Sequence, residues 1–476
     1  MRDRRVALAV CLAAGFTTLI DQSVLNVAVP ALRDSLHAGP ATTQWLLAGY
    51  SLTFGLALVP AGRLGDVHGR RGLFIAGILL FTAASLVAGT ATHAWVLAAA
   101  RLLQGAGAGI VNPQVLGTIQ DLFTGPARAR ALGAYATVGG LAALAGPVAG
   151  GLIIQSFGGE LGWRLVLLIN VPFGLLTAAV ALRVLPRGGG RGRRTTLDLP
   201  GLVLLAAVTL AALLPFIVSA GWPAWLLVAC AGTGAFLAWE RRYARAGGTP
   251  ILLPALIRSR GFVLGTLVAM FQFGASVSVS LVLTLLLQMG LGFSPLGAAL
   301  TVLPSALGFA VSSVLSWRLV ARYGRRGVAW ATVGSVFTVL VTILVVAGVP
   351  RSEIAWALAA TQLAMGVAAG LVNSPNQALT LGYAPPQAAG LAAGFLQVSQ
   401  RISATISLAA VTGLFLRTGG THGGARDGAV AGLVVCLGML LASAGLAFVG
   451  TTRTTARAPA TERPRPSPVT VPSESP

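Results

Sequence analysis

The stretch Gly62-Arg63-Leu64-Gly65-Asp66-Val67-His68-Gly69-Arg70-Arg71 separates two long apolar segments. It is repeated once, in modified form, later in the chain. Its second copy is Arg318-Leu319-Val320-Ala321-Arg322-Tyr323-Gly324-Arg325-Arg326, with alanine in place of the acid. A second repeat has the same spacing: Gly105, Gly109 and Asn112 recur as Gly366, Gly370 and Asn373. The chain is therefore predicted to consist of two related halves, an architecture that membrane transporters use.

The composition is that of a polytopic membrane protein. Hydrophobic residues make up 55% of the 476 positions, charged residues only 9%, and the mean hydropathy is +0.82. Apolar stretches of about 20 residues predict membrane helices. They lie near residues 6–28, 42–62, 72–91, 95–120, 129–155, 162–185, 200–219, 223–240, 262–289, 295–317, 328–349, 354–379, 388–416 and 428–450.

The protein is predicted to be all-helical, and the repeat indicates how its fourteen segments are divided into parts. Segments two and four correspond to segments ten and twelve, so segments seven and eight are an insertion between two six-helix halves. The expected parts are an N-terminal half (1–185), an inserted two-helix segment with its linkers (186–260), a C-terminal half (261–450) and a disordered tail (451–476). We expect a monomer.

The net charge of +21 comes entirely from arginine and is distributed between the apolar segments. Most arginines fall on loops on the side of the N-terminus, as the positive-inside rule requires. This predicts that both termini are cytoplasmic and that the protein lies in the cell membrane. It does not indicate nucleic-acid binding, because the charges form no continuous basic face.

Asp21 is the acidic residue that falls well inside an apolar segment, and Arg101 is a basic residue at similar depth. An ionised side chain there costs at least several kcal/mol unless it is paired or hydrated. Arginine does not lose its proton, so Arg101 needs an acceptor or water. Asp21 is a candidate acceptor, backbone or glutamine groups are others, and Arg101 could instead extend outward from a helix end.

Several motifs resemble those of the major facilitator superfamily. The stretch from Gly62 to Arg71 is similar to the family signature between the second and third helices, and the stretch that begins at Arg101 is similar to its arginine motif on the fourth. In the fifth segment, Gly139, Gly146, Pro147, Gly150 and Gly151 resemble the motif of its proton-driven exporters. Physically, small residues allow close helix packing and proline allows a kink.

Other motifs narrow the resemblance to the fourteen-helix drug:proton antiporters. Asp21 with Asn26, the stretch Gly162-Trp163-Arg164 and the stretch Asn170-Val171-Pro172 all resemble that group. The resemblance implies a proton-driven multidrug or antibiotic exporter that works by alternating access, with Asp21 and Arg101 coupling proton movement. Some members that export dications carry further acids in late helices, but Glu353 and Asp427 lie at a segment end and in a loop.

Further roles follow for other residues. Asp66 could cap a helix N-terminus and pair with Arg70 or Arg71. With Gly62 and Gly69, it would thereby hold the cytoplasmic ends of the two halves together. Arg401 could bind an anionic substrate group or backbone carbonyls. The candidate substrate-lining residues, each of which could instead make interhelical hydrogen bonds, are Asn26, Gln44, Asn112, Gln272, Gln362, Asn373, Asn376 and Arg401.

Two alternative functions remain. A proton-coupled importer would use the same scaffold, but the fifth-segment motif favours export. A membrane enzyme would need converging catalytic groups, whereas the four histidines are scattered. The expected partners are an amphiphilic small molecule, protons and the lipid bilayer; no metal or cofactor is expected, because Cys11, Cys230 and Cys436 have no metal-ligand spacing.

Overall fold

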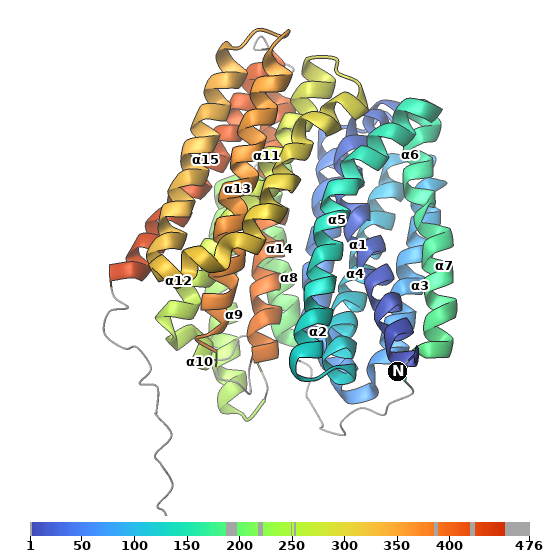
Figure 1. Ribbon diagram of the computed structural model, residues 1–476, viewed down its shortest axis with the longest axis vertical. Coiled ribbons are helices and arrows are strands. Elements are labelled where there is room, and N and C mark those ends of the chain that lie inside the picture. The colour runs from blue at the N-terminus through green and yellow to red at the C-terminus, as the bar shows by residue number, and fades with distance from the viewer. Residues whose placement is uncertain are drawn as a thin grey trace, which may run out of the picture.

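The helices form two bundles that stand side by side in the computed structural model (Figure 1). The structure describes residues 2–186, 198–217, 222–248, 250–251, 254–384, 389–418 and 424–452. The first bundle contains α1 (Arg2–Ser35), α2 (Pro40–His68), α3 (Arg70–Gly89), α4 (Ala94–Leu122), α5 (Gly125–Phe157), α6 (Gly159–Leu168) and α7 (Asn170–Val184).

The inserted pair consists of α8 (Leu199–Ile217) and α9 (Trp222–Arg245). The second bundle follows it. Its elements are α10 (Pro254–Arg258), α11 (Arg260–Leu285), the π-helix η1 (Leu286–Gly290), α12 (Pro295–Gly348), α13 (Ile354–Leu381), α14 (Ala389–Thr418) and α15 (Ala425–Thr452).

The membrane prediction is confirmed for the described residues. Thirteen spans there are long and apolar enough to cross a bilayer, and α14 is a further helix of 30 residues. One predicted boundary differs: the sixth segment is interrupted between α6 and α7. Segments ten and eleven are two helices, as predicted; both carry the label α12, and Gly324 breaks the helix between them. The predicted tail lies outside the described residues, apart from its first two positions.

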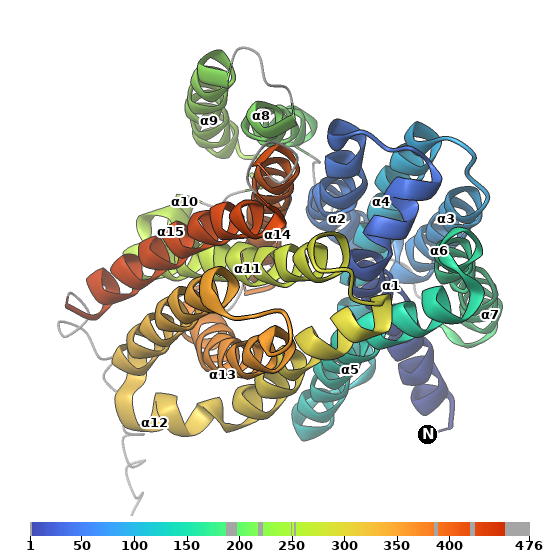
Figure 2. The ribbon, with the colours of Figure 1, turned by 90° about the horizontal axis from the view of Figure 1, so that it is seen from above.

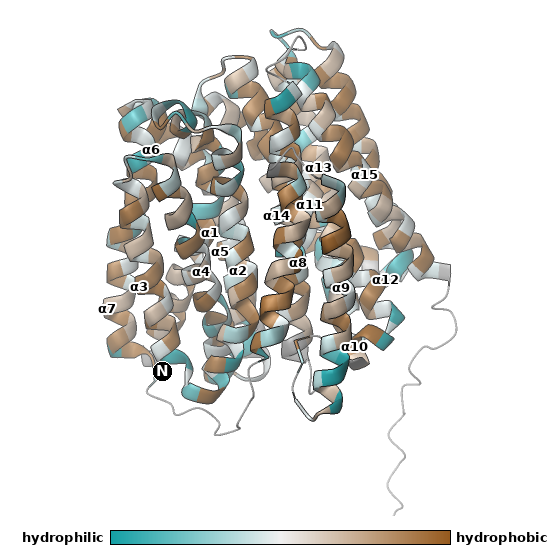
Figure 3. Cartoon of the chain, turned by 180° about the vertical axis from the view of Figure 1, so that it is seen from behind, coloured by the Kyte–Doolittle hydropathy of each residue, from teal (hydrophilic) through white to brown (hydrophobic). Residues whose placement is uncertain are grey.

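The inserted pair lies outside the two bundles. Viewed from above, α8 and α9 stand beside α14, and α8 also contacts α2 (Figure 2). Their outer surface is mainly hydrophobic (Figure 3), with Val203 and Leu227 exposed by 67% and 71%. Because no buried partner covers these side chains, they suit contact with lipid acyl chains.

The sequence repeat has a structural counterpart. A Cβ added at Gly105 of α4 would collide with the carbonyl oxygen of Tyr50 in α2. One added at Gly109 would collide with the carbonyl oxygen of Phe54. The related glycines of α13 meet α12 in the same way: Gly366 lies against the carbonyl of Ser305 and Gly370 against that of Phe309. Glycine lets these helix backbones approach closely in both halves.

The repeated stretch is largely helical rather than a loop. Residues 62–68 form the last turns of α2, and α3 begins at Arg70. Between them Gly69 has a φ of 91°, and its counterpart Gly324 has a φ of 52°. Both values lie in the region that favours glycine, so each glycine provides the turn between two antiparallel helices.

Candidate functional site: a buried ion pair

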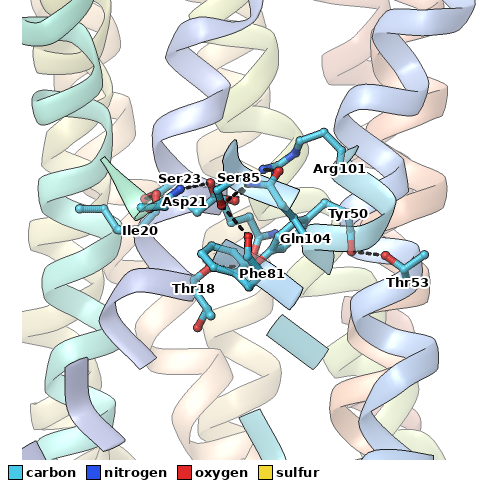
Figure 4. A network of polar contacts seen from close by, with 12 residues as sticks. Thr18, Ile20, Asp21, Ser23, Tyr50, Thr53, Phe81, Ser85, Arg101 and Gln104 are labelled. Atoms are coloured by element: carbon cyan, nitrogen blue, oxygen red, sulfur yellow. Dashed lines mark hydrogen bonds and ion pairs between the residues drawn. The ribbon is translucent and has the colours of Figure 1, made fainter. Parts of the chain in front are cut away.

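Asp21 and Arg101 form a direct ion pair in the middle of the first bundle. Arg101 Nη1 lies 2.6 Å from Asp21 Oδ2, and each side chain is only 1% exposed. Asp21 comes from α1 and Arg101 from α4 (Figure 4). The alternative in which Arg101 extends outward from a helix end is therefore wrong. Each charge compensates the other, which an apolar interior requires.

Side chains from three other helices surround the pair. Asn170, at the start of α7, donates from Nδ2 to Asp21 Oδ1 over 2.7 Å. Arg101 Nη1 also donates to Gln104 Oε1 over 2.9 Å, and Gln104 in turn donates to Ser85 over 2.8 Å. Both carboxylate oxygens and Nη1 of the guanidinium are thus held in place.

Tyr50 of α2 completes the enclosure. The Arg101 guanidinium lies 4.5 Å from the centroid of its ring, a cation–π contact, and the Tyr50 hydroxyl donates to the Thr18 carbonyl. Arg101 Nε has no hydrogen-bond partner among the described residues. The guanidinium therefore has three kinds of neighbour: the carboxylate, the Gln104 amide and an aromatic face.

The glycine-rich face of α5 packs against α1 next to Asp21. A Cβ at Gly146 would collide with Ser23, one at Gly150 would press on Val24, and Gly139 lies near Leu19. Ser23 donates to the Ala142 carbonyl over 2.9 Å. Gly151, beyond Pro147, meets the Leu296 backbone of α12, so this face touches both the Asp21 helix and the second bundle.

Arg401 connects the two bundles from α14. Its Nη1 donates to Gln22 Oε1 over 2.5 Å, and its guanidinium lies 4.1 Å from the Phe54 ring centroid and 5.7 Å from that of Phe273. It takes part in none of the three ion pairs of the described residues. Within the described part of the chain, the printed contacts of the Arg401 guanidinium are to the Gln22 side chain and these two rings, and neither predicted role is tested. Gln22 directly follows Asp21.

The residues predicted to line the substrate site differ in their contacts. Three make interhelical hydrogen bonds: Asn112 to Tyr135, Gln272 to Ser335 and Asn376 to the Gly265 carbonyl. Gln44 and Gln362 are 1% exposed, and each has a side-chain atom without a hydrogen-bond partner among the described residues, as does the half-buried Asn373. Gln44 lies against Gly413 of α14, and Asn26 is half-buried on α1.

The stretch from Gly62 to Arg71 ties helices within the first bundle. Arg70 binds Asp66 over 2.7 Å and Asp121 of α4 over 2.8 Å, and Arg71 donates to the Leu182 carbonyl of α7. The expected capping role of Asp66 is wrong for α3, whose N-cap is Gly69 without a side-chain bond. A Cβ at Gly117 would collide with Arg70, so glycine makes room for this ion pair.

Sequence reasoning missed several residues around Asp21. Asn170 stands out in the sequence only as part of a motif, and Gln104, Ser85 and Tyr50 carry no signal of their own. Polar residues are common in transmembrane helices as packing contacts, so their type alone does not show that they face one carboxylate.

Comparison with known proteins places this chain in a family. Residues 11–408 match the sequence profile of the Major Facilitator Superfamily. The chain is 34% identical to a probable actinorhodin transporter of Streptomyces coelicolor, over 87% of this chain and 72% of that protein. It is 33% identical to a puromycin resistance protein of Streptomyces alboniger (93% and 90% covered) and 34% identical to a cephamycin export protein of Amycolatopsis lactamdurans (88% and 86% covered).

Solved structures share the fold. An auto-inhibited peptide transporter of the POT family superposes with a TM-score of 0.70 at 17% identity, covering 98% of this chain and 99% of its own. A bacterial homologue of the lysosomal transporter Spinster, in an inward-facing and unoccupied conformation, gives 0.66 at 16% identity, with 94% and 97% covered. The family match spans most of the chain, and the chain is a multi-pass membrane protein of the transporter class rather than an enzyme. This chain belongs to the major facilitator superfamily.

Proposed function

We propose that this transporter exports an amphiphilic small molecule, such as an antibiotic, in exchange for protons that enter the cell. The observation that carries the proposal is the buried Asp21–Arg101 pair, held on α1 beside the glycine face of α5. The name of the cephamycin export protein supports the direction of transport, and the names of the actinorhodin and puromycin relatives support the class of substrate. The proposed unit is a monomer with the four-part division predicted above.

Asp21 is the proposed proton carrier. When it takes a proton, Arg101 loses its counter-charge but keeps the Gln104 amide oxygen at 2.9 Å and the Tyr50 ring at 4.5 Å. Release of the proton restores the ion pair. Protons and substrate are coupled only if the outward-open and inward-open states bind them with different affinities.

Alternating access is proposed to open and close the contacts between the two bundles near their outer ends. Gly151 packs on Leu296, and Gln288 donates to the Val27 carbonyl over 3.1 Å. Both contacts lie near the end of the bundle opposite to the end that carries the N-terminus, as tracing each helix from the N-terminal end shows. With cytoplasmic termini, these contacts support a state that is closed toward the outside. The stretch from Gly62 to Arg71 acts as the proposed gate at the cytoplasmic end.

Transport by purified protein in proteoliposomes tests the proposal. An inward proton gradient should drive substrate against its own gradient, and adding substrate should change the internal pH. Neutral, cationic and anionic amphiphiles should be compared. Asp21→Asn should abolish the pH change. Substrate movement in the same direction as protons would instead identify an importer.

A further inference from the structure

Arg325, at the turn inside α12, differs in its surroundings from its repeat counterpart in the first bundle. In the repeat it corresponds to Arg70, and both follow the glycine of the turn directly. Arg70 has two counter-charges, because it binds Asp66 over 2.7 Å and Asp121 over 2.8 Å. Arg325 takes part in none of the ion pairs of the described residues.

Neither acid has a counterpart in the second half, where Ala321 and Gly382 occupy the two aligned positions. Residues 241–352 and 354–426 contain no aspartate or glutamate. The helices α10 to α14 therefore supply no carboxylate, and the one acid of α15 lies in its first turn, at the other end of that helix. The second half has kept the arginine and lost both of its counter-charges.

The guanidinium of Arg325 is held in a fixed position. Its Nη2 donates to the carbonyl oxygen of Gly261, in the first turn of α11, over 3.2 Å. Its Cζ lies 4.7 Å from the centroid of the Tyr383 ring, just beyond α13, and its Nη1 lies next to Gly450 of α15. Its Nε is buried and has no hydrogen-bond partner among the described residues. The ends of three helices thus surround an arginine that has hydrogen-bonding capacity left.

A small cavity continues from Arg325 into the second bundle. Gly265 of α11 and Asn376 of α13 line it together with the arginine. Thr380 is fully buried, and a Cβ added at Gly265 would collide with its hydroxyl. This hydroxyl, like Arg325 Nε, has no hydrogen-bond partner in the part of the chain that the structure describes. Two buried polar atoms without a protein partner thus lie beside the same cavity.

The surface around Arg325 is that of a membrane interface. Tyr323 and Trp330 of α12 are 52% and 66% exposed, and Trp330 packs edge-on against Phe448 of α15. Exposed tyrosine and tryptophan are enriched at the level of the lipid headgroups. In the proposed orientation this level belongs to the cytoplasmic leaflet, which carries anionic lipids. The exposed arginines at this end of the second bundle are Arg258, Arg260, Arg318, Arg322 and Arg326.

We propose that Arg325 binds the phosphate of an anionic membrane lipid, which provides the counter-charge that two acids provide in the first bundle. A guanidinium suits a phosphate, because its planar fork can donate to two oxygens together. The positive-inside rule explains why arginines lie on this side, but not why one of them is packed on Tyr383 beside a polar cavity. The chain's own tail is a poor source of negative charge, since residues 453–476 contain four arginines and two glutamates.

Lipid binding to the purified full chain tests this site. Delipidated protein in neutral detergent is titrated with phosphatidylglycerol or with phosphatidylcholine, and bound lipids are counted by native mass spectrometry. The wild-type protein should bind phosphatidylglycerol in preference. Arg325→Gln should weaken this binding more than about tenfold, because hydrogen bonds to a charged group are lost. Arg326→Gln removes the same charge from an exposed neighbour and should weaken it less than about fivefold.

A second variant keeps the arginine and supplies the missing acid. Ala321→Asp restores a carboxylate at the position that corresponds to Asp66, so it should pair with Arg325 and weaken lipid binding as much as Arg325→Gln does. Circular dichroism and gel filtration should show that each variant is folded. Asp21→Asn should bind phosphatidylglycerol like the wild type, so this proposal and the proton-exchange proposal can fail independently.

Three results would overturn the proposal. Equal losses in Arg325→Gln and Arg326→Gln would show that the arginines act only as a diffuse positive surface. Equal binding of phosphatidylcholine would show that the phosphate charge is not recognised through a net anionic headgroup. Displacement of phosphatidylglycerol by an excess of inorganic phosphate would assign the site to a soluble anion instead of a lipid.

Discussion

At the residue scale, the Asp21–Arg101 pair is both a stabilising contact and a vulnerable one. Removing one partner of a buried ion pair leaves the other charge without compensation, at a cost of about 3–5 kcal/mol. Asn170 and Gln104 hold the pair in position but do not carry a compensating charge. Stability and proton coupling therefore depend on the same two side chains and must be separated by experiment.

A double-mutant comparison separates them. Asp21→Asn should fold but unfold at lower temperature, since Arg101 is left unpaired; the loss should be about 3–5 kcal/mol. Adding Arg101→Gln should recover much of that loss without restoring proton-driven export. Thermal unfolding and proteoliposome transport measure the two effects. Uphill transport by Asp21→Asn at the wild-type rate would contradict the proton-carrier role.

Arg101→Lys tests the geometry of the cation. A lysine keeps the charge but lacks the planar group that reaches Asp21 and Gln104 together and stacks on Tyr50. Transport should fall nearly as far as in Arg101→Ala. Full activity of Arg101→Lys in the same vesicles would show that charge alone is sufficient.

Arg401 predicts the charge preference of the substrate. It lies between Gln22 and two aromatic rings and is not in an ion pair of the described residues, so an anionic or neutral amphiphile suits it better than a dication. In competition with a reporter substrate, Arg401→Ala should selectively weaken anionic compounds by about tenfold, equivalent to about 1.4 kcal/mol. Tight displacement by dications, unchanged in Arg401→Ala, would contradict the prediction.

At the element scale, small residues determine how closely the helices approach. Gly146 of α5 lies against Ser23, two residues from Asp21, whereas Gly140 on the same helix has open space where a Cβ would be added. The glycine face therefore links the position of α5 to that of the proton-carrying segment of α1.

These two glycines provide a matched pair of variants. Gly146→Ala should push α1 away, with an overpacking cost of about 1–3 kcal/mol and a marked loss of transport. Gly140→Ala should change neither property by much. Unfolding temperature and transport rate are measured for both. Equal effects at the two positions would show that helix propensity, rather than close packing on α1, explains the glycines.

At the scale of the whole molecule, the two bundles meet where α5 packs on α12 and where α2 packs on α14. Gly151 packs against Leu296 at one end, and Arg401 reaches Gln22 and Phe54 near the middle. The ion pairs of Arg70 with Asp66 and with Asp121 both lie within the first bundle. The proposed transport cycle requires the end contacts to open.

A cross-link tests this requirement. Cysteines are placed at positions 151 and 296, which are in direct contact, in a chain lacking its three natural cysteines. Transport by the reduced variant is measured first, because a side chain at position 151 presses on the Leu296 backbone. Oxidation should arrest transport, and reduction should restore it. A pair at positions 89 and 168, which lie together within the first bundle, should cross-link without arresting transport. Continued transport through the 151–296 cross-link would argue against opening at this end.

The sequence by itself determined the membrane class, the fourteen segments, the repeat and the candidacy of Asp21 and Arg101. These features follow from hydropathy, periodicity and the cost of a charge in an apolar segment, which are all local properties of the chain. Only the tertiary structure decided that Asp21 meets Arg101 and Asn170 and that Asp66 pairs with Arg70 within one bundle. Such pairings depend on the rotation and packing of helices far apart in sequence, which no single segment encodes.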